Sequence, residues 1–301
     1  MVRSAFVTGC SSGLGKEVAL SLLAQGYRVF AGVRSAQDAD AIRTGRSAVT
    51  PIRMDLRDME QIRAAASRID QLCGAEGLAL LVNAAGYTFV SPFEFTEEQR
   101  ARDLFEVLFH GPAILTKALL PALKRNRGCQ DASPKVMNII SWAAIDANPF
   151  VGYYSAAKAA LLRLSDAQHY EFKRIGISAI SIIPGLMRTP FITVKSAASV
   201  ERSLRQLTAE GLARYASSLA HMAALGRGAQ SSSLIPNPDV VARRVVQIAQ
   251  TRRPRSRYLI GTDTRLVDLL NRTLPLCMLE AIKTKVFRLG DSYSLARASR
   301  S

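Results

Sequence analysis

The sequence predicts a single doubly wound α/β domain, in which helices cover both faces of one parallel sheet. Three observations lead to this fold class. Short, continuously apolar segments alternate with segments of helical periodicity, as expected for parallel strands buried on both faces. A glycine-rich loop joins the first apolar segment to the first helix. The chain has 301 residues, 48% hydrophobic and 21% charged, which suits one large domain with a sizeable core.

The elements follow from local pattern. The expected strands are short β-prone apolar runs bounded by turn residues: Ala5–Val7, Tyr27–Val33, Leu78–Val82, Val136–Ile140, Ile177–Ile183 and Arg257–Ile260. The expected helices place apolar residues three and four positions apart: Lys16–Gln25, Asp58–Cys73, Glu97–Leu123, Ser155–Arg174 and Asp239–Gln250. Gly26 and Gly74 supply the stop signals of the first two.

A helical lid is expected within the main domain, which we place at residues 1–262. The lid, at about 190–236, is rich in Ala, Ser and Leu and suits one or two helices. Four of its apolar residues fall at helical spacing: Tyr215, Leu219, Met222 and Leu225. These side chains either roof a pocket or pack the lid onto the body.

Residues 263–301 are expected to form a C-terminal helical extension that ends in a mobile tail, SYSLARASRS. Pro275 interrupts its apolar residues, which are Leu266, Leu269, Leu270, Leu274, Leu276, Leu279, Ile282 and Phe287. Basic residues flank them: Arg265, Arg272, Lys283, Lys285 and Arg288. Such an extension caps the substrate site, joins a dimer, or lies on a membrane surface as a peripheral contact.

Composition limits the function classes. The net charge of +16 and the pI near 10.2 raise the question of nucleic acid, but basic residues are spread widely, with local clusters at Lys124–Arg127 and Arg252–Arg257. Because no zinc-finger spacing or RNA-binding aromatic signature accompanies them, we expect no nucleic-acid partner. A basic surface that attracts anions, such as a phosphorylated cofactor, is the better interpretation.

Cysteine usage and hydropathy bear on compartment. Cys10, Cys73, Cys129 and Cys277 show neither metal-ligand spacing nor a disulfide framework, so we expect a reducing compartment and no metal site. No apolar run approaches the length of a transmembrane helix, and the N-terminus MVRSAFVTGC lacks the apolar core of a signal peptide. We therefore expect a cytoplasmic protein without a transmembrane segment.

The loop Thr8-Gly9-Cys10-Ser11-Ser12-Gly13-Leu14-Gly15 stands between the first strand and the first helix. Glycines there let the backbone approach a pyrophosphate, and the helix N-terminus offers N–H groups to the anion. At the end of the second strand, VFAGVRS has no acid that would favour NAD. Arg34 beside Ser35 suits the 2′-phosphate of NADP(H) instead, although a strand-end arginine is also an ordinary surface residue.

Residues 153–158, YYSAAK, place Tyr154 and Lys158 on one face of a helix. A phenol has a pKa near 10, so it carries protons at neutral pH only when its surroundings tune that value. Tyr153 competes for this role, but Lys158 lies five residues after it and faces elsewhere. The pattern favours Tyr154.

Six motifs in this order resemble those of the short-chain dehydrogenase/reductase (SDR) family, over roughly residues 4–190. They are the loop Thr8–Gly15; Asp55 with Leu56 in MDLRD; Asn83-Ala84-Ala85-Gly86; Ser141; the pair Tyr154 and Lys158; and Pro184-Gly185-Leu186-Met187-Arg188-Thr189. GCSSGLG and VFAGVR are most similar to the hydroxysteroid and retinol dehydrogenase branch.

The resemblance implies a Rossmann-type fold, an NADP(H) site and a homodimer or homotetramer formed through the fourth and fifth helices. It implies cofactor contacts from Gly9, Ser11, Ser12, Gly13, Leu14, Gly15, Arg34, Ser35, Asp55, Leu56, Asn83, Ala84, Gly86, Tyr154, Lys158, Pro184, Gly185 and Thr189.

By the same resemblance, the catalytic residues are Ser141, Tyr154 and Lys158. Tyr154 is the expected general acid, with a pKa lowered by the Lys158 ammonium and by the oxidised cofactor. Lys158 also binds the nicotinamide ribose, and Ser141 holds the carbonyl oxygen. The implied substrate is a bulky apolar carbonyl or secondary alcohol.

The chain departs from the family pattern at three places. Leu108 stands where the family has an Asn that supports a water in the proton relay. Three interpretations are open: the relay uses only backbone and water, His110 takes the place of the Asn, or the protein is no longer an efficient redox enzyme. Ala84 replaces the second Asn of N-N-A-G, and Ala144 a common glycine. Trp142 either lines the substrate pocket or packs its loop.

The leading hypothesis is an NADP(H)-dependent ketoreductase or alcohol dehydrogenase. One alternative is an enzyme of the same fold with a non-redox net reaction, such as a dehydratase, epimerase or cyclase, which Leu108 keeps open. The other is a weakly active NADP-binding regulatory protein, against which the presence of Ser141, Tyr154 and Lys158 argues.

Overall fold

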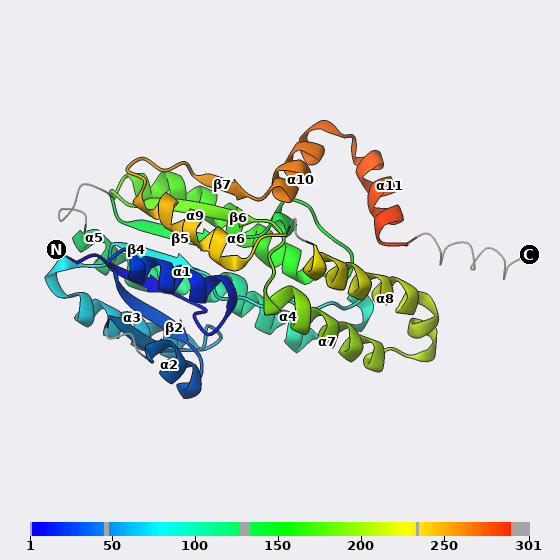
Figure 1. The fold of residues 1–301 in the computed structure, drawn as a ribbon, viewed down its shortest axis with the longest axis horizontal. Coiled ribbons are helices and arrows are strands. Elements are labelled where there is room, and N and C mark those ends of the chain that lie inside the picture. Colours follow the sequence, from blue (N-terminus) through cyan, green and yellow to red (C-terminus); the bar gives the residue numbers. More distant parts are fainter. Residues whose placement is uncertain (1, 45–47, 127–132, 233–234, 290–301) are drawn as a thin grey trace, which may run out of the picture.

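The computed structural model describes residues 2–44, 48–126, 133–232 and 235–289 (Figure 1). Within them, seven strands form one parallel sheet in the order β3-β2-β1-β4-β5-β6-β7. The strands are β1 (Ser4–Val7), β2 (Arg28–Val33), β3 (Val49–Arg53), β4 (Leu80–Asn83), β5 (Lys135–Ile139), β6 (Ser178–Pro184) and β7 (Arg257–Ile260). The order turns back at β1, so β1 and β4 form the switch point of a doubly wound fold.

Helices cover both faces of the sheet (Figure 1). The helices are α1 (Gly13–Ala24), α2 (Ala36–Arg43), α3 (Met59–Cys73), α4 (Glu98–Phe105), α5 (Gly111–Arg125), α6 (Gly152–Lys173), α7 (Pro190–Gln206), α8 (Ala209–Ser231), α9 (Pro238–Gln250), α10 (Thr262–Thr273) and α11 (Leu276–Val286). One buried cluster joins the sheet to α1 and α9, and another joins its opposite face to α3 and α5. Ala5 and Val7 belong to the first cluster and Phe6 to the second, because successive strand side chains point to opposite faces.

The predicted α/β fold is confirmed, and the six expected strands lie within two residues of their predicted bounds. The prediction omitted α2 and β3. In α2, AQDADAIR, only Ile42 is buried, so little apolar periodicity marks the helix. In β3, VTPIR, Pro51 argues against a strand, but β3 is an edge strand, where proline is tolerated.

The expected long helix at Glu97–Leu123 is α4 and α5 joined by a π-turn, Glu106–His110. Pro112 has no N–H to offer the carbonyl of Leu108, which accounts for the wider turn just before it. The whole segment, Glu98–Arg125, is long and apolar enough to cross a membrane by length and composition alone. Leu115, Leu119 and Leu123 are buried in the core of the domain, which accounts for this apolar composition.

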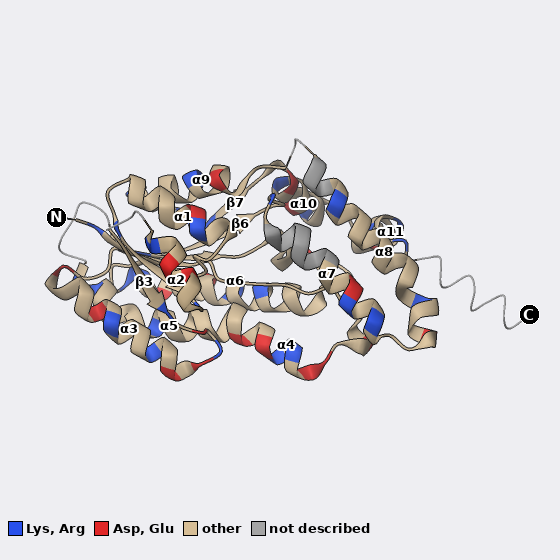
Figure 2. Ribbon diagram, turned by 60° about the horizontal axis from the view of Figure 1, so that its bottom comes forward, with Lys and Arg blue, Asp and Glu red and all other residues tan. Residues whose placement is uncertain are grey.

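The lid consists of α7 and α8, which pack against each other on the side of the sheet's carboxyl edge. Helices α10 and α11 follow β7 and project from the body above α8 (Figure 1). The predicted tail, 292–301, and the residues Arg127 and Cys129 lie outside the described residues. Lys and Arg are distributed over helices on both sides of the sheet (Figure 2).

Candidate active site

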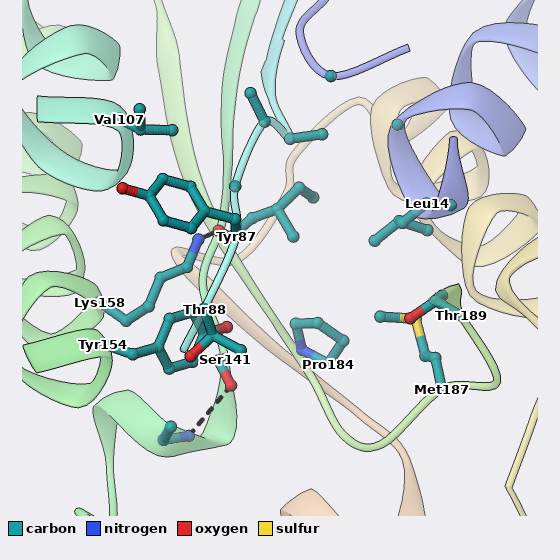
Figure 3. Close-up of a pocket in the computed structure, with 18 of the residues that line it drawn as sticks. Leu14, Tyr87, Thr88, Val107, Ser141, Tyr154, Lys158, Pro184, Met187 and Thr189 are labelled. Atoms are coloured by element: carbon teal, nitrogen blue, oxygen red, sulfur yellow. Dashed lines mark hydrogen bonds between the residues drawn. The ribbon is translucent and has the colours of Figure 1, made fainter. Parts of the chain in front are cut away.

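A cavity of about 830 Å³ lies at the carboxyl ends of the strands, where open α/β sheets bind their ligands (Figure 3). The segments that follow β1 to β6 form its floor and walls, and residues of α8 and α11 complete it. The charged residues of this lining are Arg34, Asp55, Arg57 and Lys158. The remaining wall is neutral and largely apolar.

The glycine-rich loop forms one wall of the cavity and packs closely against neighbouring backbone. Gly9 and Gly13 have φ angles of 75° and 61°, which favour glycine. A Cβ on Gly9 would lie 2.7 Å from Cα of Ala85, and one on Gly15 would lie 2.4 Å from the Gly9 carbonyl oxygen. Thr8 fixes the loop, because its Oγ1 accepts hydrogen bonds from the N–H groups of Ala84 and Ala85, each at 3.0 Å. Ser11, Ser12 and Leu14 line the cavity beside the glycines.

Arg34 lies at the far end of the same wall, exposed and within the lining. Ser35 is not brought into the lining. Its hydroxyl caps α2, accepting from the Asp38 N–H at 3.0 Å and donating to the Asp38 carboxylate at 2.7 Å. Of the two residues predicted to meet a 2′-phosphate, Arg34 alone has a free approach to the cavity.

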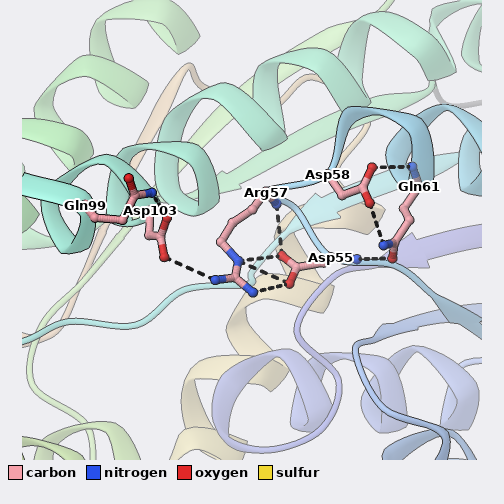
Figure 4. Close-up of polar contacts among 6 residues, drawn as sticks. All are labelled: Asp55, Arg57, Asp58, Gln61, Gln99 and Asp103. Atoms are coloured by element: carbon pink, nitrogen blue, oxygen red, sulfur yellow. Dashed lines mark hydrogen bonds and ion pairs between the residues drawn. The ribbon is translucent and has the colours of Figure 1, made fainter.

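Asp55 is held by a residue that the sequence analysis missed (Figure 4). The Arg57 backbone N–H donates to Asp55 Oδ1 at 2.9 Å, and Arg57 Nη2 donates to Oδ2 at 2.7 Å. Arg57 Nη1 donates to Asp103 of α4 at 3.1 Å. The side-chain hydrogen bond from Arg57 lowers the pKa of Asp55. Arg57 therefore latches the β3–α3 loop to α4, and both Asp55 and Arg57 face the cavity.

Asn83 supports the wall from behind rather than lining it. Its buried Nδ2 donates to Asn138 at 2.7 Å and to Thr116 at 3.1 Å, which ties β4 to β5 and α5. Leu56, Ala84, Gly86, Pro184, Gly185 and Thr189 line the cavity, as predicted. Asp263, another residue that the sequence did not reveal, accepts from the Leu186 N–H at 2.7 Å and so holds the segment after β6.

Ser141, Tyr154 and Lys158 converge on the inner wall (Figure 3). Ser141 precedes the short turn Trp142–Ala144 and accepts a hydrogen bond from the Ala143 N–H at 3.2 Å. Tyr154 and Lys158 stand one turn apart on α6. The Lys158 ammonium donates to the Ile139 carbonyl at 2.7 Å.

Burial shifts the pKa values of Tyr154 and Lys158 in opposite directions. It raises the pKa of Tyr154 to about 12, although a hydrogen bond with Ser141 acts in the opposite direction. It lowers the pKa of Lys158 to about 8. The predicted lowering of the Tyr154 pKa by Lys158 and the oxidised cofactor is not seen in this structure, where burial raises that pKa and Ser141 acts in the opposite direction. At neutral pH, Tyr154 is a protonated phenol beside a cationic Lys158.

Comparison with known proteins agrees with this arrangement. The family described as short chain dehydrogenase matches residues 3–199. Human retinol dehydrogenase 5 is 30% identical over 290 residues, which cover 93% of this chain and 87% of that protein. The uncharacterized oxidoreductase YbbO of Escherichia coli K12 is 29% identical over 276 residues, 91% of each chain. The chain belongs to the SDR family.

Solved structures share the fold. A short-chain dehydrogenase from Streptomyces avermitilis superposes with a TM-score of 0.72 at 24% identity, covering 100% of this chain and 98% of that one. An SDR from Burkholderia cenocepacia in complex with NADP gives 0.66 at 23% identity over 95% and 97% of the two chains. An SDR from Burkholderia phymatum in complex with NAD gives 0.71 at 20% identity over 89% and 92%.

Leu108, which stands where the family pattern has an Asn, is buried among apolar side chains. Leu108 lies in the π-turn, fully buried, and packs with Phe89, Leu104 and Ala157. A Cβ on Gly86 would lie 2.9 Å from Leu108 Cδ2, so Leu108 fills the space beside the loop that bears Gly86. His110 is exposed, stands against Phe109 and is not part of the lining. Substitution by His110 is therefore not supported.

Tyr153 turns away from the cavity, as the helical spacing predicts. Its ring stacks on Phe93, with centroids 5.7 Å apart and planes at 13°. Trp142 lines the cavity, which decides between its two interpretations, whereas Ala144 packs behind the wall near Ile140 and Leu161. Of the two neighbouring tyrosines, Tyr154 lines the cavity and Tyr153 does not; Tyr87 lines it too (Figure 3).

The roof comes from the lid and from the C-terminal extension. Met222 and Leu225 line the cavity, whereas Tyr215 and Leu219 pack the lid onto the body, so each interpretation of that stripe holds for half of it. Val286 and Phe287 also line the cavity; Phe287 belongs to the apolar residues of the extension for which capping was one predicted role, whereas Val286 was not among them. An ion pair joins Lys283 to Asp146, and the His221 ring bonds to the Val286 carbonyl oxygen at 3.0 Å. Of the three roles considered for the extension, capping the pocket is the one that the structure shows.

Proposed function

We propose that this SDR is an NADP(H)-dependent oxidoreductase that transfers hydride between the nicotinamide and a bulky, apolar carbonyl compound or secondary alcohol. One observation carries the proposal: Ser141, Tyr154 and Lys158 meet on the wall of a cavity that has a phosphate-binding loop on one side and a neutral, apolar chamber on the other. Tyr154 is the general acid or base, Lys158 its cationic neighbour, and Ser141 the hydroxyl that holds the reacting oxygen.

The residues present fit a nicotinamide dinucleotide. Gly9 and Gly15 leave space where any Cβ would collide, which lets backbone approach a pyrophosphate. Arg34 offers an exposed guanidinium at the end of β2, where no acid stands to bind an unphosphorylated ribose. When bound, the cofactor supplies or accepts the hydride. The preference for NADP(H) rests on Arg34 and on the basic net charge of +16.

The chain's own part in the reaction is to hold oxygen and to move one proton. Ser141 donates a hydrogen bond to the carbonyl oxygen and stabilises its developing charge. Tyr154 passes its hydroxyl proton to that oxygen, and the Lys158 ammonium stabilises the phenolate left behind. Tyr154 is protonated at neutral pH, so its hydroxyl carries the proton that carbonyl reduction needs. The reverse transfer serves alcohol oxidation.

The substrate class follows from the chamber opposite the loop. Its apolar wall includes Trp142, Val151, Met222 and Phe287. A charged substrate would lose its hydration there without gaining a partner, so a neutral, bulky compound fits best. The relationship to retinol dehydrogenase 5 supports an apolar alcohol or carbonyl.

The test follows absorbance of the reduced nicotinamide while the purified protein meets NADPH or NADH and a panel of apolar ketones and aldehydes. We expect oxidation of NADPH with at least one bulky apolar carbonyl, and its loss in Ser141→Ala. If NADPH binds tightly and no carbonyl is reduced, the proposal of redox turnover is wrong.

Leu108 supports a second candidate, a non-redox reaction such as dehydration, epimerisation or cyclisation. The buried Leu108 side chain offers no amide at the position where the family pattern has one to support the proton relay, which is the reason to consider a reaction without repeated redox turnover. Tight NADPH binding, no ketone reduction, and conversion of substrate without change in nicotinamide absorbance would favour this candidate. A regulatory NADP-binding role predicts binding with neither reaction.

Assembly is a separate proposal. We infer a homodimer or homotetramer in the cytoplasm, on the family resemblance and on the exposed rings of Phe93 and Tyr170 beside α4 and α6. Light scattering after size-exclusion chromatography measures the mass directly, and a monomer at micromolar concentration would contradict the proposal.

A further inference from the structure

Helices α10 and α11 carry a large share of the exposed large hydrophobic side chains. Of the 13 large hydrophobic side chains exposed within the described residues, six lie on these two helices. They form what we call the apolar C-terminal face: Leu266, Leu269, Leu276, Met278, Ile282 and Val286. Single exposed apolar residues are ordinary, but this concentration on one projecting hairpin marks an interaction surface.

The orientation of α11 is fixed by contacts of Lys283, which lies about 100° round the helix from Ile282. Met278, Ile282 and Val286 recur every four residues and stay 43% to 49% exposed. Lys283 forms its ion pair with Asp146 and donates to the Ala147 carbonyl at 3.0 Å. The apolar face is therefore held outward by a folded, anchored helix.

This face continues into the mouth of the cavity. Leu225 and Val286 both line the cavity, yet 42% and 46% of their surfaces are exposed to solvent. An apolar path thus leads from the outer face of α11 to the chamber opposite the phosphate loop. The apolar C-terminal face and the cavity lining therefore share Val286 and meet at the cavity mouth.

Charge decides which partner fits. Arg265, Lys285 and Arg288 are exposed around the face, and among the described residues none of them has an acidic partner within ion-pair distance. Three exposed cations against one exposed acid on α11, Glu280, leave these helices with net positive charge beside apolar residues, which matches the boundary between acyl chains and anionic headgroups. A second copy docked by two-fold symmetry would bring the same cations against one another.

We propose that α10 and α11 dock this protein onto the surface of an anionic phospholipid bilayer, with the cavity mouth facing the lipid. Ile282 and its neighbours enter the acyl boundary, and Lys285 and Arg288 meet the phosphate groups. The docking is peripheral and reversible, because the face is short and only partly apolar.

Vesicle flotation tests this proposal without any activity assay, so its failure and that of the proposed enzyme function are distinguishable. The full chain is mixed with phosphatidylcholine vesicles that contain phosphatidylglycerol, and with vesicles of phosphatidylcholine alone. We expect flotation with the anionic vesicles and little with the neutral ones. Absence of flotation with anionic vesicles would overturn the proposal.

Matched variants locate the surface. Ile282→Glu should lower the partition coefficient about tenfold or more, whereas Val240→Glu on α9, where 47% of Val240 is exposed, should not. Lys285→Glu should weaken binding more than Arg63→Glu on α3, although both change the net charge equally. Equal losses in either matched pair would overturn the proposal. So would a loss of oligomer mass in Ile282→Glu, which would show that a second copy covers this face.

Discussion

The two halves of the cavity are built in opposite ways. The cofactor half consists of backbone and small residues from the ends of β1 to β6, braced by buried polar groups such as Thr8 and Asn83. The substrate half consists of large apolar side chains from loops and helices far apart in the sequence. The cofactor half thus tolerates almost no added atom, whereas the substrate half can exchange one apolar side chain for another. Predictions that distinguish the halves follow, from the largest expected effect to the smallest.

Gly9→Ala should damage the cofactor half most. The new Cβ would lie 2.7 Å from Cα of Ala85 at a φ of 75°, so backbone must shift. We expect the free energy of unfolding to fall by about 3 kcal/mol or more, and NADPH affinity to fall about 100-fold. Calorimetry and fluorescence titration measure the two quantities.

Gly26→Ala is the matched control for that variant. Its φ of 78° imposes the same backbone strain, but nothing lies within 4 Å of the added Cβ. We expect a loss of about 1–2 kcal/mol in unfolding free energy and unchanged NADPH affinity. Similar losses of affinity in both variants would show that close contact in the loop is not what matters.

Lys158 should give the fold a distinctive pH dependence. Its pKa is about 8 when folded and near 10.4 when unfolded, so between these values the unfolded chain binds more protons. Stability should therefore rise with pH across that window, by up to about 3 kcal/mol from this group. Denaturant unfolding at both ends of the window, in wild type and Lys158→Met, measures the contribution. The rise should be smaller in the variant, and an equal rise in both would contradict the burial argument.

Substitutions of Arg34 and Arg57 should have different effects on the KM values for NADPH and NADH. Arg34→Ala should raise KM for NADPH about tenfold or more and leave KM for NADH unchanged, because only NADPH carries the 2′-phosphate. Arg57→Met should raise both KM values alike, since Arg57 positions Asp55 and the β3–α3 loop. If Arg57→Met changes the ratio and Arg34→Ala does not, the assignment is reversed.

Met222→Ala should have the smallest effect and confine it to the substrate half. Met222 lies in the roof, and its truncation enlarges the chamber without touching the loop. We expect KM for bulky ketones to change by a few fold, and NADPH affinity to stay the same. A parallel loss of NADPH affinity would show that the halves are not independent.

The same contrast explains what the sequence could predict. Short motifs could be predicted because local backbone structure alone sets the relative positions of their residues. A single turn does so for Thr8–Gly15, and one helical turn does so for Tyr154 and Lys158. All six predicted strands are confirmed for the related reason that continuous apolar runs mark buried parallel strands. Ser35 and Asn83 show the limit of carrying residues over from a family: one caps a helix and the other braces the wall from behind.

Residues that act across long sequence distances escaped prediction. Val286 reaches the cavity only because Lys283 meets Asp146, 137 positions earlier in the chain. Asp263 holds the Leu186 N–H across 77 positions. No local periodicity signals such contacts. The raised pKa of Tyr154 also depends on burial by distant segments, which is why spacing alone suggested a lowered value.

The most direct measurement compares Tyr154→Phe with Tyr153→Phe, following NADPH oxidation and NADPH binding on the same preparations. Tyr153 stacks outward on Phe93 and should be replaceable without loss of turnover. Tyr154→Phe should lose about 10²- to 10⁴-fold in kcat while still binding NADPH. Retained turnover in Tyr154→Phe, or an equal loss in Tyr153→Phe, would contradict the assignment of Tyr154 as the proton donor.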